Sequence, residues 1–163
     1  MKVTQQSNYL NDGYVVRKDN GDDEVIHIPY NINNVLITED QVKEILEKNN
    51  VKVDKINHLH YFHKAFTHKS YVNKNIIPKH VLESAKKEIG NIGNLLELRD
   101  ESYERLEYFG DRVVKIVVSM YLFHRYPNED EGFMTRLQTK IEDKKNLASM
   151  SREIGLSKYF IIS

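Results

Sequence analysis

Three acidic residues, spaced so that a helix would place them on one face, are the first candidates for chemistry in this chain. They are Glu104, Glu107 and Asp111. At 3.6 residues per turn, positions three and seven residues apart line up along one side of a helix. Carboxylates this close repel one another, and a hard cation such as Mg²⁺, which takes oxygen ligands, would relieve the repulsion. A solvated acidic edge is the alternative, because most Glu and Asp side chains are exposed.

The helix that would carry these acids is apolar on most of its other sides. Gly110 separates the acidic face from the apolar one and would let a ligand or another backbone approach closely. The run from Val113 to Val118 is apolar nearly all round, which is typical of a buried helix. A solvated edge rarely leads straight into a core, so the pattern favours a functional site. The apolar stripe consists of Leu106, Phe109, Val113, Ile116, Val117 and Met120.

The segment 104–111, Glu-Arg-Leu-Glu-Tyr-Phe-Gly-Asp, resembles the ribonuclease III signature Glu-Arg-Leu-Glu-Phe-Leu-Gly-Asp. Upstream, residues 65–70 are similar to the family's Ala-Leu-Thr-His-Arg-Ser segment. The resemblance covers residues 55–160 and is dense around the signature. Its downstream matches are Tyr126-Pro127, Asp130-Glu131-Gly132, Met134-Thr135, Asn146-Leu147-Ala148 and Gly155-Leu156.

The resemblance implies a metal-dependent endoribonuclease that cleaves double-stranded RNA. Glu107 and Asp111 match catalytic metal-ligand positions for Mg²⁺, with Mn²⁺ as a substitute. Glu104 and Glu131 match acidic positions with an accessory role. Tyr108 matches an aromatic residue that packs into the partner subunit, which implies a homodimer. Double-stranded RNA would be recognised by its shape, phosphates and 2′-hydroxyls, and no RNA-binding residue is assigned.

The sequence also departs from the family pattern. The family completes its metal site with a second acidic pair, Asp-x-x-Glu, after the Gly-Leu segment, and no such pair follows Asp111 here. Arg112 stands where a small residue is usual, and Glu142 stands where an apolar one is usual. A double-stranded RNA-binding domain is absent from these residues. We therefore expect half of the metal site in this chain and no activity from the chain alone; it is part of a longer polypeptide or a repurposed relative.

Composition narrows the class of protein. The 163 residues suffice for one domain with a core, and the absence of cysteine excludes disulfides and thiolate chemistry. Lys plus Arg and Asp plus Glu balance at 24 each, so the overall basic charge typical of nucleic-acid binding is missing. A local basic excess in residues 41–80 suits a phosphate-binding site and is equally explained by chance. No apolar run reaches membrane-spanning length, so an intracellular, cytoplasmic protein with no membrane partner is expected.

Residues 1–50 differ in character from the rest. Strand-like runs at 14–16 and 25–28, with turn signals at 12–13 and 20–23, predict a hairpin or loose β arm, with disorder as the alternative. Thr38 is predicted to cap a short helix that ends at Asn49-Asn50. We expect residues 1–50 to form an N-terminal extension with this helix. Residues 51–163 then form a ribonuclease III-like domain, incomplete at its C-terminal end.

The middle of the chain contains an apparent insertion relative to the family, residues 72–102, with a helix predicted from Pro78 to Ile89. Four histidines crowd the preceding helix, at 58, 60, 63 and 68. A zinc site is disfavoured because neither a cysteine nor a clear acidic partner completes a tetrahedral set. Further helices are predicted after Glu131, with Met134, Leu137 and Ile141 on one side, and up to Gly155.

These patterns predict an all-α fold organised around a buried signature helix: the first half of a ribonuclease III-like endonuclease domain, with a small irregular or β-containing N-terminal arm. The predicted function is a divalent-metal-dependent endoribonuclease acting on double-stranded RNA in RNA processing. The alternative is a catalytically silent dimerising or RNA-binding module on the same scaffold.

Overall fold

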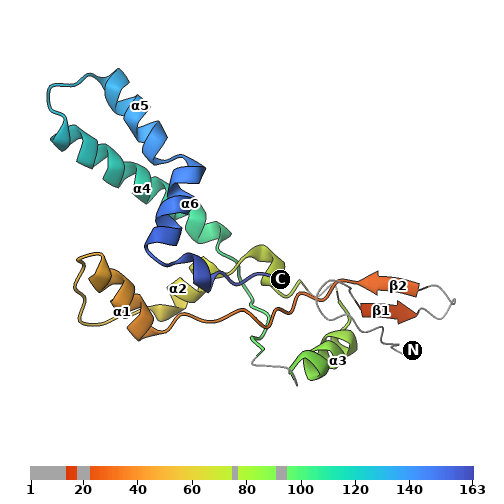
Figure 1. Cartoon of the computed structure of the whole chain (residues 1–163). Coiled ribbons are helices and arrows are strands. Elements are labelled where there is room, and N and C mark those ends of the chain that lie inside the picture. The colour runs from red at the N-terminus through yellow and green to blue at the C-terminus, as the bar shows by residue number, and fades with distance from the viewer. Residues whose placement is uncertain (1–13, 18–22, 75–76, 91–94) are drawn as a thin grey trace. The chain divides into compact units, whose positions relative to one another are not determined.

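The computed structural model describes residues 14–17, 23–74, 77–90 and 95–163 (Figure 1). The chain divides into two compact units. We call Leu36–Phe66 with Tyr103–Phe160 the helical unit, and Met1–Val35, Thr67–Ser102 and Ile161–Ser163 the arm unit. The boundary at residue 50 between an extension and a ribonuclease III-like domain stays a prediction.

The helical unit contains the signature helix and most of the other helices. In chain order these are α1 (Glu39–Lys48), α2 (Leu59–Phe66), α4 (Glu104–Arg125), α5 (Glu131–Ile141), α6 (Lys144–Glu153) and a 3-10 turn, η2 (Ser157–Tyr159). The long helix α4 and the shorter α5 lie side by side as a helical hairpin (Figure 1). The predicted all-α fold class is confirmed, since this unit is helical throughout its regular elements.

The arm unit contains the β structure that the sequence predicts. Strands β1 (Tyr14–Arg17) and β2 (Asp23–Ile26) pair antiparallel, with Tyr14 opposite Ile26. Strand β2 ends two residues before Ile28, where the predicted strand ended. The turn signals at 12–13 and 20–22 lie outside the described residues. The unit also holds a 3-10 turn, η1 (Lys69–Tyr71), and helix α3 (Lys79–Gly90), which begins directly after Pro78 as predicted.

Helix α1 begins and ends as its local sequence predicts. The Thr38 hydroxyl accepts a hydrogen bond from the Gln41 amide, and the Gln41 side chain accepts one from the Thr38 amide, which forms a capping box. At the other end Asn50 has a positive φ of 63°. The Val51 amide reaches back to the Leu46 carbonyl at 2.9 Å. This is the Schellman arrangement, in which asparagine tolerates the left-handed conformation better than most residues.

The core of the helical unit lies between α1, α2 and η2. Ile37, Val42 and Tyr159 are buried there. The Phe66 ring contacts Tyr159 and Phe160 at centroid distances of 6.1 and 5.9 Å. Partly buried apolar side chains complete the cluster: Ile45, Leu46, Ile56, Leu59, Phe62 and Phe66.

The prediction that the signature helix is the buried centre of the fold is wrong. Within α4, all of whose residues are described, Leu122 alone is buried. Phe109, Ile116 and Val117 are each about 60 % exposed, at 65, 62 and 59 %. Helical periodicity reports that an apolar face exists, but it does not say what covers that face. Here α2 and α5 contact parts of α4 and leave much of the apolar stripe open.

The arm unit has its own small core around Tyr71, Val81 and Ala85, all fully buried. The Tyr71 hydroxyl donates to the Leu96 carbonyl at 2.7 Å. The buried side-chain amide of Asn34 donates to the Ile162 carbonyl and accepts from the Ile162 amide, at 2.8 and 3.1 Å. Long-range hydrogen bonds therefore fix the described part of this unit. Among the helices of the described residues, none combines the length and apolar character that a membrane crossing requires.

Candidate functional site

The first two turns of α4 carry the three predicted acids on one side. Glu104, Glu107 and Asp111 all have exposed side chains. Glu104 and Glu107 lie in the first turn, where negative charge interacts favourably with the helix dipole. Exposure suits an open metal site and a solvated acidic edge equally, so geometry alone leaves both interpretations standing. Nothing lies within 4 Å of a Cβ built on Gly110, so this position is open.

Asp111 differs from a plain surface acid because it has a cationic partner. The Lys115 ammonium, one helical turn away, lies 2.8 Å from the Asp111 Oδ2 atom. This hydrogen bond, with a smaller contribution from the Arg112 charge, holds the pKa of the Asp111 carboxyl below its usual value. The same contact raises the pKa of Lys115. Asp111 is therefore fully ionised at neutral pH, as a metal ligand must be.

Arg112 covers one face of Tyr108. Its guanidinium carbon lies 3.6 Å from the centre of the Tyr108 ring, and its Nη1 donates to the Tyr108 carbonyl at 2.6 Å. The ring remains 64 % exposed. The arginine at this unusual position therefore stacks on the aromatic residue predicted for the dimer interface, in a cation–π arrangement.

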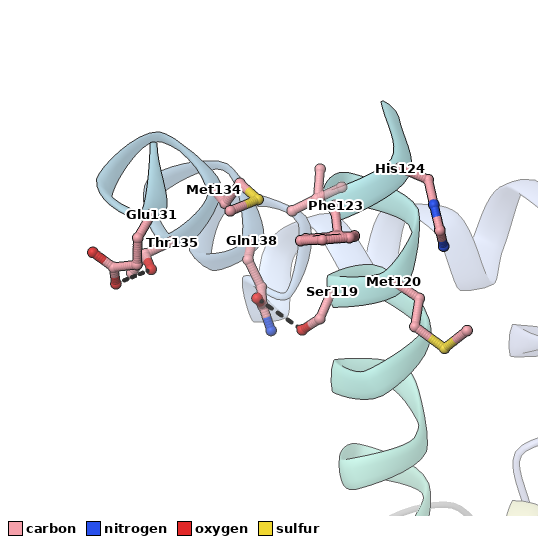
Figure 2. A pocket seen from close by; sticks show the side chains of 9 residues that line it. Ser119, Met120, Phe123, His124, Glu131, Met134, Thr135 and Gln138 are labelled. Carbon is pink, nitrogen blue, oxygen red and sulfur yellow. Dashed lines mark hydrogen bonds between the residues drawn. The ribbon is translucent and has the colours of Figure 1, made fainter. Parts of the chain in front are cut away.

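Glu131 lies apart from the acids of α4. It occupies the first turn of α5 and accepts a hydrogen bond from the Thr135 hydroxyl at 2.9 Å. Figure 2 shows it with Thr135 beside a pocket between α4 and α5, where Met134 points toward Phe123. The pocket has a volume of ≈ 410 Å³, and its lining consists of Ser119, Met120, Leu122, Phe123, His124, Glu131, Met134, Thr135 and Gln138.

The spacing along α4 separates this pocket from the acids. Ser119 is the pocket residue nearest in sequence to Asp111, and eight helical residues span about 12 Å. The structure therefore brings Glu104, Glu107 and Asp111 together, while the contacts of Glu131 are with the pocket. The accessory role of Glu131 stays a prediction.

A polar network joins α4 to α5 beside the acids. The Ser119 hydroxyl contacts the Lys115 carbonyl and the Gln138 Oε1 atom, at 2.7 and 3.1 Å. The Gln138 amide donates to the Glu142 carboxylate at 2.7 Å. The Glu142 charge also acts on Lys115, whose pKa it helps to raise. Sequence reasoning missed Lys115 as part of the site, although its position four residues after Asp111 is the spacing of a helical ion pair.

Glu107 and Asp111 fit a hard divalent cation by donor chemistry, because both offer exposed carboxylate oxygens one turn apart. Two carboxylates are an incomplete shell. Among the described residues, no three His, Cys, Asp or Glu side chains lie close enough together to hold a metal ion. Two of the crowded histidines have structural contacts instead: His63 Nε2 lies 2.8 Å from the Ile37 carbonyl, and His68 caps η1.

Comparison with known proteins supports the ribonuclease III interpretation. Residues 104–163 match the model of the ribonuclease III domain. The chain is 31 % identical over 135 residues to a probable ribonuclease 3 of Acanthamoeba polyphaga mimivirus, covering 82 % of this chain and 24 % of that protein. It is 42 % identical over 59 residues to ribonuclease 3 of Methylococcus capsulatus, covering 36 % of this chain and 26 % of that one. For ribonuclease 3 of Acinetobacter pittii the values are 37 % over 62 residues, 38 % and 27 %.

No solved structure is detectably similar to the chain. The chain spans about a quarter of the length of the curated relatives it matches. The matches to the bacterial relatives cover little more than a third of this chain, which is about the share that residues 104–163 make up. The segment 104–163, which carries the acids of α4, therefore belongs to the ribonuclease III family.

Proposed function

We propose that this chain supplies part of a divalent-metal-dependent endoribonuclease that cleaves double-stranded RNA. The observation that carries the proposal is the position of Glu107 and Asp111. They are exposed carboxylates one turn apart, inside the segment that matches the ribonuclease III domain. Relatives named ribonuclease 3 support the same assignment.

In this proposal Glu107 and Asp111 hold Mg²⁺, with Mn²⁺ as a substitute. The metal supplies an activated water and neutralises charge that develops on the leaving oxygen. The protein contributes the geometry, because one helix fixes the separation of the two carboxylates. It also contributes charge, because the Lys115 contact keeps Asp111 ionised. Recognition of the RNA would rest on duplex shape, phosphates and 2′-hydroxyls, in place of base sequence.

The chain by itself should bind metal weakly and should not cut RNA. The family's second acidic pair is missing from these 163 residues, and each lost ligand removes stabilisation of the transition state. We therefore expect weak Mn²⁺ binding by the isolated chain, lost in Asp111→Asn and reduced in Glu107→Gln. Isothermal titration with Mn²⁺ measures this. Glu153→Gln, an exposed acid on α6, is the matched control and should bind as the parent does.

A cleavage assay on long duplex RNA tests the reaction. The isolated chain with Mg²⁺ should leave the duplex intact. A longer form that also carries Asp-x-x-Glu should cut it. That form should lose at least a hundredfold in rate on Glu107→Gln or Asp111→Asn while still retarding RNA on gels. Cutting by the isolated chain that survives Asp111→Asn would overturn the mechanism.

A second candidate is a catalytically silent dimerising or RNA-binding module. The Lys115 contact favours it, since an ammonium already neutralises one of the two carboxylates. A longer form that carries both acidic pairs yet leaves duplex RNA uncut would establish this alternative.

We also propose that the chain forms a homodimer through α4. The exposed Phe109, Ile116 and Val117 give the helix an apolar face of the kind that marks an interface. A two-fold pair, in which the same face of each copy meets the other, is the commonest way to cover such a surface.

A further inference from the structure

Lys115 lies against carboxylates from two different helices. Its ammonium donates to Asp111 on α4 at 2.8 Å. The Glu142 carboxylate, at the C-cap of α5, acts on the same ammonium from the neighbouring helix. Arg112, the other cation near Asp111, stacks on Tyr108 and donates to its carbonyl. Lys115 is thus the cation that bonds directly to the candidate metal ligand.

Glu142 is held in place and is not a freely moving surface acid. It is partly buried, and the Gln138 amide donates to its Oε1 atom at 2.7 Å. Gln138 in turn contacts Ser119, whose hydroxyl donates to the Lys115 carbonyl. The network therefore fixes a carboxylate from α5 beside the α4 turn from which the Lys115 side chain emerges.

A divalent cation and the Lys115 ammonium compete for the same oxygen. Asp111 cannot donate a full lone pair to a metal while it accepts a short hydrogen bond from Lys115. An exposed ion pair at helical i,i+4 spacing is weak, so a dication can displace the ammonium. The displaced ammonium would then lie near the incoming positive charge, unless another carboxylate takes it.

We propose that Lys115 is a positioning residue that holds Asp111 in the metal-free chain and moves to Glu142 when a divalent cation binds. This inference rests on the proposed function, because it takes Asp111 as a metal ligand. It gives Glu142 a purpose at a position where the family has an apolar residue: it receives the lysine. Metal binding and the lysine's partner are then coupled across α4 and α5.

The test is a double-mutant cycle on Mn²⁺ affinity in the 163-residue chain, read by the electron paramagnetic resonance signal of free Mn²⁺. Lys115→Gln should tighten binding roughly threefold to tenfold, because it removes the competing ammonium. Glu142→Gln should loosen binding about threefold while Lys115 is present and should have almost no effect beside Lys115→Gln. Lys145→Gln, which removes an exposed charge on α6, should leave the affinity unchanged.

A simple effect of charge would give a different pattern. Loss of the Glu142 charge would then loosen Mn²⁺ equally in both backgrounds, and that additivity would overturn the inference. Glu142→Asp provides a second measurement that keeps the charge. A shorter side chain should still weaken Mn²⁺ binding if Glu142 must reach Lys115, whereas unchanged affinity contradicts that role. This variant also serves if thermal melting shows that Glu142→Gln does not fold.

A spectroscopic readout follows the lysine directly. On titration with diamagnetic Mg²⁺, the carboxyl ¹³C resonance of Glu142 should shift in the parent chain and stay fixed in Lys115→Gln. The cycle also separates two kinds of failure. Mn²⁺ binding that survives Asp111→Asn unaltered overturns the proposed metal site. Binding that Asp111→Asn removes, with an additive cycle, overturns only the role of Lys115.

Discussion

Asp111 and Lys115 form the contact that most changes the chemistry of α4. A hydrogen bond from a cation stabilises the ionised carboxylate, so the folded-state pKa of Asp111 lies below its ordinary value of 3.8. A depressed folded-state pKa means that the pair's contribution to stability is present above pH 3.8 and is lost as the pH falls through the folded-state pKa. Because both side chains are exposed, this contribution is small.

A titration of the Asp111 carboxyl by nuclear magnetic resonance checks this. We expect a midpoint below 3.8 in the parent chain and a higher midpoint in Lys115→Gln, which lacks the donor. Lys145→Gln should leave the midpoint where it is in the parent. An Asp111 midpoint that is the same with and without Lys115 would show that the ion pair does not persist in solution.

Single residues were predictable where the information is local. The common face of Glu104, Glu107 and Asp111 follows from helical spacing alone. The Lys115 contact has the same origin and could have been predicted. The position of Glu131 could not, because it depends on how the turn between α4 and α5 folds α5 back along α4.

Among the elements, α1 shows how far local sequence determines structure. Its capping box and its left-handed Asn50 need no tertiary contact, and both ends were predicted. The exposure of α4 could not be predicted in this way. Whether an apolar face is buried depends on which distant segments pack on it, and here the core formed between α1, α2 and η2.

The capping box of α1 should contribute measurably to stability. Thr38→Ala removes the oxygen that accepts from the Gln41 amide, so the free energy of unfolding should fall by about 1 kcal/mol. Urea denaturation followed by circular dichroism gives the value. Ser149→Ala, an exposed position inside α6, is the control and should change stability by less than about 0.5 kcal/mol.

For the whole molecule, the proposed dimer should depend on Tyr108. Its exposed ring, stacked on Arg112, presents a large aromatic surface of the kind that anchors interfaces. Tyr108→Ala should weaken self-association by about 1–2 kcal/mol, roughly tenfold in Kd, while the melting temperature of the monomer changes little.

Sedimentation velocity measures that Kd, and Tyr61→Ala on α2 provides a matched loss of an exposed tyrosine, at 50 % exposure. A parent chain that sediments only as monomer at concentrations on the order of tens of micromolar would contradict the dimer.

The run from Val113 to Val118 has a consequence for colloidal behaviour. Val-Val-Lys-Ile-Val-Val is rich in β-branched residues, which favour extended strands, and it is exposed along much of its length in α4. Short segments with this composition and no proline stack into cross-β fibrils when the native helix opens. Lys115 is the single charge within the run, and a charge at that point interrupts such stacking.

Lys115→Gln should therefore shorten the lag time of thioflavin T fluorescence in a partly denaturing buffer, whereas Lys115→Arg should match the parent. Equal lag times for all three chains would show that the run is not the nucleating segment. If the lag does shorten, the lysine beside Asp111 also acts as a gatekeeper against amyloid.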